Sequence, residues 1–263
     1  MSSDRSLEGI TLKVGPLGEH DRLLTFLSNQ EGITRLAVPG ARRPKSSLAA
    51  AVPFTVLELN VVGRRGLPKV RHIKILRSFT QIGSQLESLS AAQALSEITL
   101  QLVPINDPLD GVLNTLLIHL DRLETINNEI VPNHLISLAC TVQACVHLLA
   151  LGGYGLPLEI CCLSGRPLVA PIGEWQWRCS LLAEEGFAIG SFPHSVMELN
   201  PSELALLQRL IRPSIPFSKD GKLMGPKVVW IKLLAIIEYW INSHLLYKVK
   251  SLVMLRDIMG GED

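Results

Sequence analysis

The hydrophobic pattern of this 263-residue chain changes near residue 80, and that change limits the possible folds more than any other feature. Before it, short runs rich in Leu, Ile and Val are separated by turn sequences such as Gly15-Pro16-Leu17-Gly18, a pattern typical of β-strands. The predicted strands cover residues 9–14, 22–27, 33–38, 55–62 and 69–76. Five strands in a segment this short match a small closed barrel, for which the OB-fold is the commonest solution.

After residue 80 the apolar residues recur every three or four positions, which indicates amphipathic helices. We predict helices over residues 90–102, 108–124, 132–151, 200–211 and 227–257. The fourth has the clearest start, because Asn200 can cap it, Pro201 suits its first turn and Glu203 completes a capping box. The predicted fold is therefore an α+β multidomain one. An OB-fold domain spans 1–80, a helical domain spans 81–152 and 200–263, and a loop-rich insertion spans 153–199.

Composition narrows the class of protein. With 47% hydrophobic and 19% charged residues the chain is neither disordered nor coiled-coil. No apolar leader follows the N-terminus, and five cysteines at irregular spacing do not resemble a secreted disulfide framework. The longest uncharged stretch, 135–158, is interrupted by polar residues and glycines, so a buried helix explains it as well as a membrane span does. We expect a cytoplasmic protein with no membrane partner.

Charge is divided unequally along the chain. Residues 1–80 hold 13 Lys and Arg against 6 Asp and Glu, whereas the remainder holds 12 against 18. Nine of the 13 N-terminal cations are arginine, the side chain best suited to phosphate. This division predicts an N-terminal module that binds a polyanion and an acidic body behind it.

The cations gather in two predicted loops. The segment 40–46 resembles a phosphate-binding loop, but Lys45 comes one position too early and Pro44 replaces the second glycine. Arg42, Arg43 and Lys45 instead suit separate contacts with backbone phosphates. Arg64 and Arg65 form the second loop, with Lys69 and Arg71 on the strand that follows it.

Aromatic residues are scarce in the predicted barrel, where Phe26 and Phe54 are the only ones before Phe79. Binders of single strands usually stack bases on exposed rings, so the scarcity favours contacts with the backbone and tolerance of single and double strands.

Three cysteines raise the possibility of zinc. Cys161, Cys162 and Cys179 lie in the predicted insertion, but Ser164 stands where a C-x₂-C pair needs its second cysteine. Free thiols therefore explain them better than a metal site. Cys140 and Cys145 fall on an apolar helix as core residues, and His147 on the same helix is a satisfied core group. No motif nominates a nucleophile, a general base or an organic cofactor, so we expect no enzyme activity.

Two segments of the sequence carry a family resemblance. Residues 17–25 (LGEHDRLLT) and 38–48 (VPGARRPKSSL), with Gly32 between them, resemble the N-terminal signature of the bacterial DNA repair protein RecO family. The likeness continues at Pro53-Phe54, at 149–154, and at 161–168, where the sequence resembles the end of the family's first zinc-binding cysteine pair. It is dense in the first 60 residues and thin in the C-terminal third.

The resemblance implies an OB-fold, a helical body and often a small zinc module. It also implies binding of single- and double-stranded DNA, annealing of complementary strands and binding of the C-terminal tail of single-strand binding protein. With RecR, such a protein helps RecA to load onto covered DNA, and it works in the cytoplasm at the nucleoid. The implied DNA-contacting residues are Arg35, Arg42, Arg43, Lys45, Arg64, Arg65, Lys69 and Arg71, of which the motif itself supports Arg42, Arg43 and Lys45. The downstream cysteine pair is missing, so we expect the insertion to fold without metal, with Trp175 and Trp177 supplying apolar packing.

Two other functions remain open on the sequence. One is an RNA-binding OB module of translation or RNA processing, which would prefer RNA to DNA of equal length. The other is a non-catalytic scaffold, whose binding to nucleic acid would be weak and independent of salt.

Overall fold

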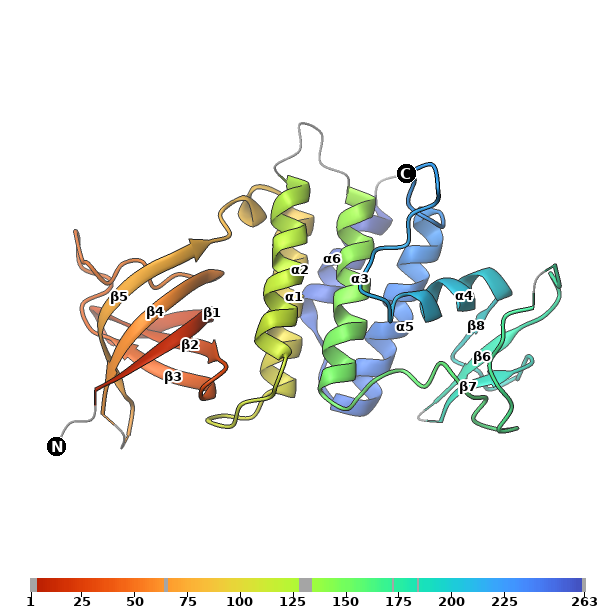
Figure 1. Ribbon diagram of the computed structural model, residues 1–263, viewed down its shortest axis with the longest axis horizontal. Helices are drawn as coiled ribbons and strands as arrows, with labels where there is room; N and C mark the ends of the chain where they lie inside the picture. The colour runs from red at the N-terminus through yellow and green to blue at the C-terminus, as the bar shows by residue number, and fades with distance from the viewer. Residues whose placement is uncertain (1–3, 64–65, 128–133, 172, 184, 262–263) are drawn as a thin grey trace.

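A computed structural model describes residues 4–63, 66–127, 134–171, 173–183 and 185–261. Its elements lie in a row, with a five-stranded sheet at the N-terminal end, helices in the middle and a small sheet at the far end (Figure 1). The prediction of an N-terminal five-stranded sheet followed by a helical region, an α+β protein, is confirmed.

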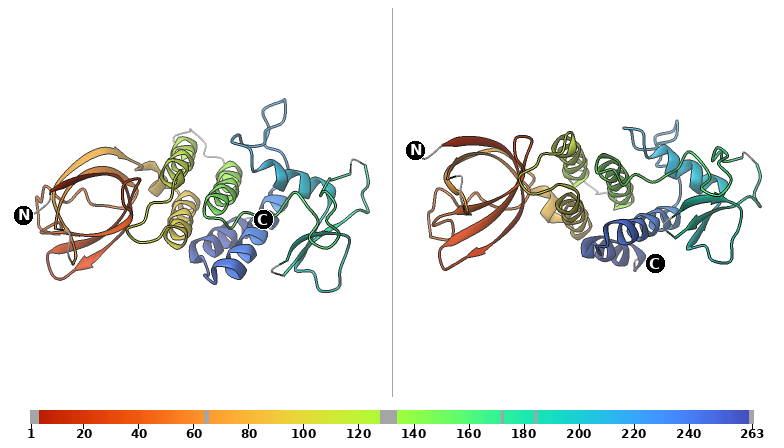
Figure 2. Two further views of the ribbon diagram at one scale, coloured as in Figure 1. Left: turned by 60° about the horizontal axis from the view of Figure 1, so that its bottom comes forward. Right: turned by 90° about the horizontal axis from the view of Figure 1, so that it is seen from below.

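The N-terminal strands are β1 (Arg5–Leu17), β2 (Asp21–Ser28), β3 (Gly32–Val38), β4 (Thr55–Val62) and β5 (Lys69–Ser78). They pair in the order β1-β2-β3-β5-β4, and β4 returns to pair with β1, so the sheet curls into a ring that is visible end-on in Figure 2. The contact between β3 and β5 is much the thinnest, because it consists of one parallel pair, Ala37 with Lys69.

One face of this sheet is buried, and the other is buried only where the helices cover it. One face fills the interior of the ring with side chains that include Leu24, Phe26 and Leu57. The other face, with Ile10 and Leu12, belongs to the same hydrophobic core as the helices. Burial on both sides explains why β3 is an apolar run interrupted only by Thr34 and Arg35, whereas β5 is mostly exposed and carries most of its charges towards solvent.

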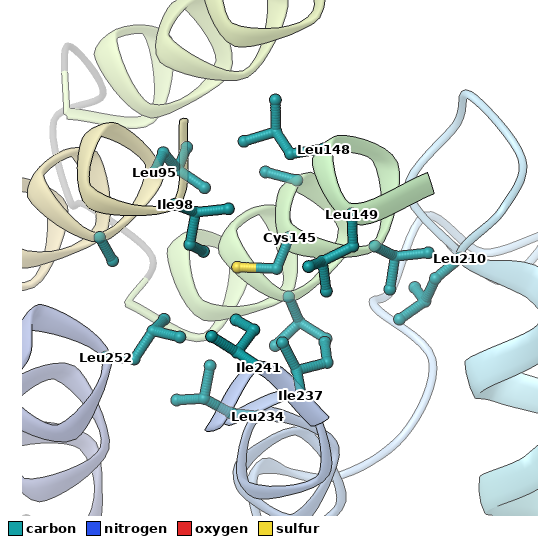
Figure 3. Packing of buried hydrophobic residues seen from close by; sticks show 14 of the residues in the cluster. Leu95, Ile98, Cys145, Leu148, Leu149, Leu210, Leu234, Ile237, Ile241 and Leu252 are labelled. Atoms are coloured by element: carbon teal, nitrogen blue, oxygen red, sulfur yellow. The ribbon is translucent and has the colours of Figure 1, made fainter. Parts of the chain in front are cut away.

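The helical region comprises a 3₁₀ turn, η1 (Gln81–Ser84), and helices α1 (Leu86–Leu102), α2 (Val112–Asn127), α3 (His134–Leu151), α4 (Pro201–Arg209), α5 (Lys227–Leu245) and α6 (Lys250–Gly260). Cys145, Leu148 and Leu149 of α3 lie at the centre of the core, among side chains of α1, α5 and α6 (Figure 3). By length and apolar composition α3 and α5 could each cross a membrane. Most of α3 and nearly half of α5 are buried inside the protein, which is how the core helices of a helical body behave.

Several helix boundaries differ from prediction, and the helix predicted over 108–124 is observed over Val112–Asn127. The first helix begins at Leu86 rather than at 90. The single helix predicted over 227–257 is wrong, because Leu246 adopts a left-handed conformation (φ 50°) and ends α5. The chain then turns into α6, whose first turn is held by Glu97 of α1. The Glu97 carboxylate accepts hydrogen bonds from the Lys250 N–H (3.1 Å) and the Ser251 hydroxyl (2.5 Å).

The insertion is more regular than its loop-rich sequence indicates. It contains a three-stranded sheet in the order β7-β6-β8, formed by β6 (Cys179–Leu182), β7 (Gly186–Ile189) and β8 (Met197–Leu199). Strands of three or four residues are too short to show a period, so the sequence pattern does not define a sheet here. By contrast, α4 begins as predicted, with Asn200 and Glu203 each accepting the other's backbone N–H at 2.9 Å.

Candidate nucleic-acid interface

A basic loop, residues 39–54, connects β3 to β4 and is fastened to the turn between β1 and β2. Asp21 Oδ1 accepts the backbone N–H of Gly40 at 2.8 Å, and the backbone N–H of Arg42 donates to the His20 carbonyl at 2.9 Å. The two halves of the sequence signature therefore contact each other. Residues 17–25 supply the support, and residues 38–48 are the loop that is supported.

Arg22 helps to support the basic loop and is not one of its exposed cations. Its Nη1 donates to the carbonyls of Ala51 (2.9 Å) and Ala49 (3.2 Å), at the far end of the same loop. Ala41 and Ala51 are buried in the ring interior and fix the loop at two points. The signature arginine is thus a structural residue, a role that its spacing alone did not reveal.

Arg42, Arg43 and Lys45 are exposed on the basic loop, where the structure brings all three together. Arg42 Nη1 donates to the Gly18 carbonyl at 3.2 Å, which directs the side chain along the turn. Within the described part of the chain, none of the three forms an ion pair with a carboxylate. Three cations without counter-charges on a fastened loop form a surface that is suited to phosphates.

The predicted cations on the strands lie near the start of this loop. Lys69 and Arg71 are exposed on β5 on either side of buried Val70. Lys69 is the β-partner of Ala37, which lies two residues before the loop begins, so Lys69 lies on the flank of β3 beside the loop. Arg71 is paired with Asp4 (3.5 Å), and part of its charge is therefore already compensated.

Arg35 is exposed on β3 and forms no ion pair with any residue that the structure describes. Arg64 and Arg65, the remaining two predicted contacts, lie outside the described residues.

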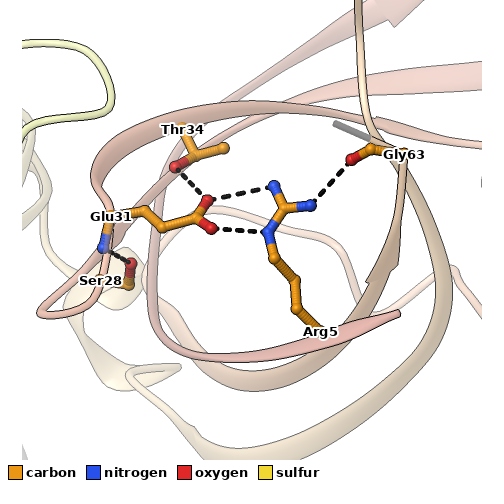
Figure 4. A network of polar contacts seen from close by, with 5 residues as sticks. All are labelled: Arg5, Ser28, Glu31, Thr34 and Gly63. Carbon is orange, nitrogen blue, oxygen red and sulfur yellow. Dashed lines mark hydrogen bonds and ion pairs between the residues drawn. The ribbon is translucent and has the colours of Figure 1, made fainter. Parts of the chain in front are cut away.

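A second arginine that sequence reasoning overlooked is Arg5. Its Nε lies 2.6 Å from Glu31 Oε1 and its Nη2 lies 3.1 Å from Glu31 Oε2, while Nη1 donates to the Gly63 carbonyl at 2.8 Å (Figure 4). The Ser28 hydroxyl oxygen accepts the backbone N–H of Glu31, and the Thr34 hydroxyl donates to Glu31 Oε2. The network ties the start of β1 to the β2–β3 turn and to the end of β4. Only the fold brings these groups together, since Arg5 and Glu31 are 26 residues apart.

No Phe, Tyr or Trp ring is offered to a ligand by the described barrel residues. Phe26 is fully buried inside the ring, and Phe54 and Phe79 are buried between the ring and the helices. The interpretation that a ligand would be held mainly through its backbone therefore gains support.

The cysteine cluster does not fit zinc. Cys161 Sγ accepts hydrogen bonds from the backbone N–H groups of Ile189 (3.3 Å) and Ser164 (3.4 Å). Burial raises the pKa of the Cys161 thiol, but these bonds and one from the Ser164 hydroxyl outweigh it and bring the pKa to about 7. The serine thus donates to the sulfur instead of completing a ligand pair. Cys162 is exposed, whereas Cys179 is buried with its pKa raised to about 12 by burial and by the neighbouring cysteines. Among the described residues, no three His, Cys, Asp or Glu side chains are placed to hold a metal.

The histidines of the helical body also have structural roles. His147 donates through Nε2 to the Leu210 carbonyl (2.9 Å), and its Nδ1 lies 3.0 Å from Nε2 of His119. Burial, helped by nearby positive charge, lowers the pKa of His119 to about 3, so this pair is neutral at physiological pH. Both ring nitrogens of His147 are therefore satisfied, as expected, but the side chain is only half-buried and is not a core group. Cys140 and Cys145 are buried, and burial raises each thiol pKa to about 12.

Lys and Arg also gather locally within the acidic body, where a count over the whole region conceals them. Lys219 and Lys222 lie at an exposed hairpin that projects from the helices beyond α4 (Figure 2), with Arg209 and Arg212 exposed just before it. A charge count in short windows would have found this segment.

The chain is similar to known proteins over almost its whole length. A family model described as Recombination protein O N terminal matches residues 1–79, and one described as Recombination protein O C terminal matches residues 83–252. A DNA repair protein RecO of Prochlorococcus marinus (strain MIT 9303) is 63% identical over 257 residues, which cover 98% of this chain and 96% of that protein. Another, of Synechococcus sp. (strain WH7803), is 58% identical over 99% of this chain and 97% of its own length. A third, of Cyanothece sp. (strain PCC 7425 / ATCC 29141), is 29% identical over 97% of this chain and 96% of its own.

Proposed function

Because the chain belongs to the RecO family, which has a role in DNA repair and recombination, we propose that it is a non-enzymatic DNA-binding mediator of recombinational repair. It binds single- and double-stranded DNA and anneals complementary strands. With RecR it helps RecA to load onto DNA covered by single-strand binding protein, whose C-terminal tail it contacts. It works in the cytoplasm at the nucleoid.

The proposed DNA-binding element is an OB-fold formed by residues 1–80. The strand order and the ring of pairings support this assignment. The helical domain then comprises 81–152 and 200–263, with 153–199 inserted as a small module that has lost most of its zinc ligands. The boundary between the two family models, at residues 79–83, agrees with the first division.

The observation that carries the proposal is the basic loop. Its fastening to Asp21 and Arg22 limits its freedom, so little conformational entropy is lost when Arg42, Arg43 and Lys45 meet phosphates. Lys69 extends the same surface along β5. Arg35, Arg64, Arg65 and Arg71 complete the proposed set, with Arg71 weakened by its pairing with Asp4.

Annealing follows from the electrostatics of this surface. Two complementary strands repel each other through their phosphates, and cations that contact both strands lower that repulsion. Most bases remain free to pair, because no Phe, Tyr or Trp ring on the described barrel surface stacks on them. No covalent chemistry is needed, so the protein acts by positioning strands.

The test is annealing of two complementary oligonucleotides, each coated with single-strand binding protein. The wild-type protein should accelerate duplex formation, and Arg42→Ala/Arg43→Ala/Lys45→Ala should lose most of that acceleration. Lys74→Ala is the matched control, because Lys74 is also an exposed cation of the barrel but is paired with Glu58 at 3.1 Å. Equal acceleration by all three proteins would refute the proposed loop, and no acceleration by the wild type would refute the proposed activity.

An RNA-binding module remains the alternative, since a basic barrel without stacking rings does not by itself distinguish the sugars. Binding to DNA and RNA strands of equal sequence decides between the two, because only contacts with the 2′-hydroxyl favour RNA.

A further inference from the structure

The thin contact between β3 and β5 leaves part of β3 without a β-strand neighbour on that side. The parallel pairing reaches only Ala37, near the end of β3. At the beginning of β3, Ile33 pairs instead with Ile105, from the connection between α1 and α2, and Asn106 donates its backbone N–H to the Ile33 carbonyl at 2.9 Å. The helical body therefore completes the seam at one end, and β5 completes it at the other.

This docking is close and requires glycine. Gly32 has φ +63°, and a Cβ added there would lie 2.3 Å from the Asp107 carbonyl oxygen. Asn106 also has a positive φ (56°), a conformation that asparagine tolerates better than most residues. The connection is thus held against β3 in one arrangement, so the space beside it has a defined shape.

A groove of about 700 Å³ lies between the two ends of the seam. Its walls are β3, the residues just before β5 and the α1–α2 connection. The volume falls within the range of about 300–1,000 Å³ that is typical of small-molecule sites. It is therefore large enough for a base with its sugar.

The walls combine three kinds of chemistry. Leu67 and Ile105 leave 39% and 56% of their surfaces exposed and so offer apolar surface to a ligand. Gln30 and Asn106 bring side-chain amides, each of which can donate and accept hydrogen bonds. Arg35 brings a guanidinium that has no carboxylate partner in the described chain.

The carboxylate in the groove does not cancel that charge. Glu31 is held by Arg5 through two contacts of 2.6 and 3.1 Å, and these two residues neutralise each other. The backbone N–H of Arg35 adds a further hydrogen-bond donor to the groove. Peptide groups alternate in direction along a strand. The Ile33 carbonyl and the Ala37 N–H both point into the seam, so the peptide groups of Arg35, midway between them, do so too.

We propose that this groove holds one unstacked nucleotide of a bound single strand, with its base between Leu67 and Ile105, its edge at the amides of Gln30 and Asn106, and its phosphate at Arg35. The proposal rests on the proposed DNA binding and gives it a site for an unpaired base. A groove of mixed character, with two exposed apolar side chains, two amides and one cation, matches a base, its polar edge and its phosphate. It also supplies a contact with bases that the buried phenylalanines of the barrel do not.

The groove lies beside the proposed phosphate surface, because Lys69 and Ala37 form one end of the seam. A strand that follows the basic loop and Lys69 would reach the groove next. The occupant is therefore a nucleotide within a strand and not a free nucleotide, which would lack the phosphate contacts on either side.

The test compares two strands of equal length at one salt concentration: oligothymidylate, and a strand in which every sugar lacks its base. Wild-type protein should bind oligothymidylate about five- to tenfold more tightly, in line with the gain of one sheltered base. Asn106→Gly, which keeps the backbone conformation, and Leu67→Ser should each reduce this ratio towards one while leaving the affinity for the base-free strand unchanged. Arg42→Ala is the control and should weaken binding of both strands equally.

Four results would overturn the inference. Equal wild-type affinity for the two strands would refute the groove but leave the proposed DNA binding intact, whereas binding of neither strand would refute both. Effective competition by thymidine monophosphate would show that the groove takes a free nucleotide instead. Circular dichroism melting of Leu67→Ser and Asn106→Gly checks that each variant is folded, and a wild-type ratio in folded Asn106→Gly and Leu67→Ser would also refute the assignment.

Discussion

The salt dependence of DNA binding gives the sharpest test of the basic loop. The perturbation is Arg42→Ala/Arg43→Ala/Lys45→Ala, which removes three exposed cations that have no carboxylate partners among the described residues. Each cation that contacts a phosphate releases a counterion from the DNA, and the number released sets how steeply the affinity falls with salt. The triple variant should therefore differ from wild type in slope as well as in affinity.

The expected size follows from the count of cations. Each contact with a single strand contributes about 0.7 to the slope of log affinity against log salt, so three contacts contribute about 2 units. Between about 50 and 200 mM salt, the wild-type protein should lose roughly 20-fold more affinity than the variant does. A loop that folds back, or that bears only one contact, would change the slope by less than one unit.

The assay is fluorescence polarisation of a labelled single strand, titrated at four or more salt concentrations. Lys74→Ala serves as the control because its ion pair with Glu58 keeps it from acting as a free cation, and its slope should match that of wild type. Identical slopes for wild type and the triple variant would refute the argument even if their affinities differed.

Four further predictions follow from particular contacts. Arg22→Met should lower the stability of the protein by about 1–2 kcal/mol through the loss of its hydrogen bonds to the loop. Its salt slope should stay near the wild-type value, and an unchanged melting temperature would contradict the supporting role. The Cys161 thiol, with its pKa lowered to about 7, should ionise as pH rises through neutrality. Because its folded pKa lies below its unfolded value of 9.0, ionisation adds stability above pH 7 that is lost as pH falls. In a Cys162→Ser background the ultraviolet absorbance of the thiolate should rise near pH 7, and a rise only near pH 9 would refute the hydrogen-bonded thiolate. Purified protein should contain well under one zinc per chain and melt at the same temperature with and without a chelator, so a stoichiometric zinc content would be decisive against this expectation. Leu246→Gly should stabilise the protein by about 1 kcal/mol, because Leu246 is 89% exposed and left-handed, and glycine adopts that conformation without strain. A lower melting temperature for this variant would show that the leucine side chain makes a contact that outweighs the strain.

Local sequence predicted the parts of the fold that depend on local interactions. Each predicted N-terminal strand is present, because runs of branched residues and the glycines between them fix strands and turns within a few residues. The start of α4 was predictable for the same reason, since Asn200 and Glu203 are three residues apart and complete their capping box alone. The family resemblance came from the same N-terminal segments.

The predictions failed where distant residues decide. The break at Leu246 has no glycine or proline to announce it, and α6 begins where it does because Glu97, about 150 residues earlier, holds its first turn. The strands of the insertion are too short to show a period, and β6 is stabilised by neighbours on both sides. The candidate site shows the same difference between local and long-range information. The residue types of the basic loop were visible in the sequence, but the role of Arg22 was not.

The sequence by itself therefore determined the N-terminal strands, the start of α4, where cations gather, and that the second cysteine of a zinc pair is a serine. Only the tertiary structure decided which of those cations are available. Arg5 and Arg22 are bound within the fold, Arg71 is partly compensated by Asp4, and Arg42, Arg43 and Lys45 form no ion pair among the described residues. The physical reason is that a cation already bonded to groups of its own fold has less charge and fewer hydrogen-bond donors left for a ligand. Those groups come from elements far apart in the chain. The groove beside β3 is also a property of the tertiary structure, because the residues around it come from β1, β3, the β4–β5 connection and the helical body.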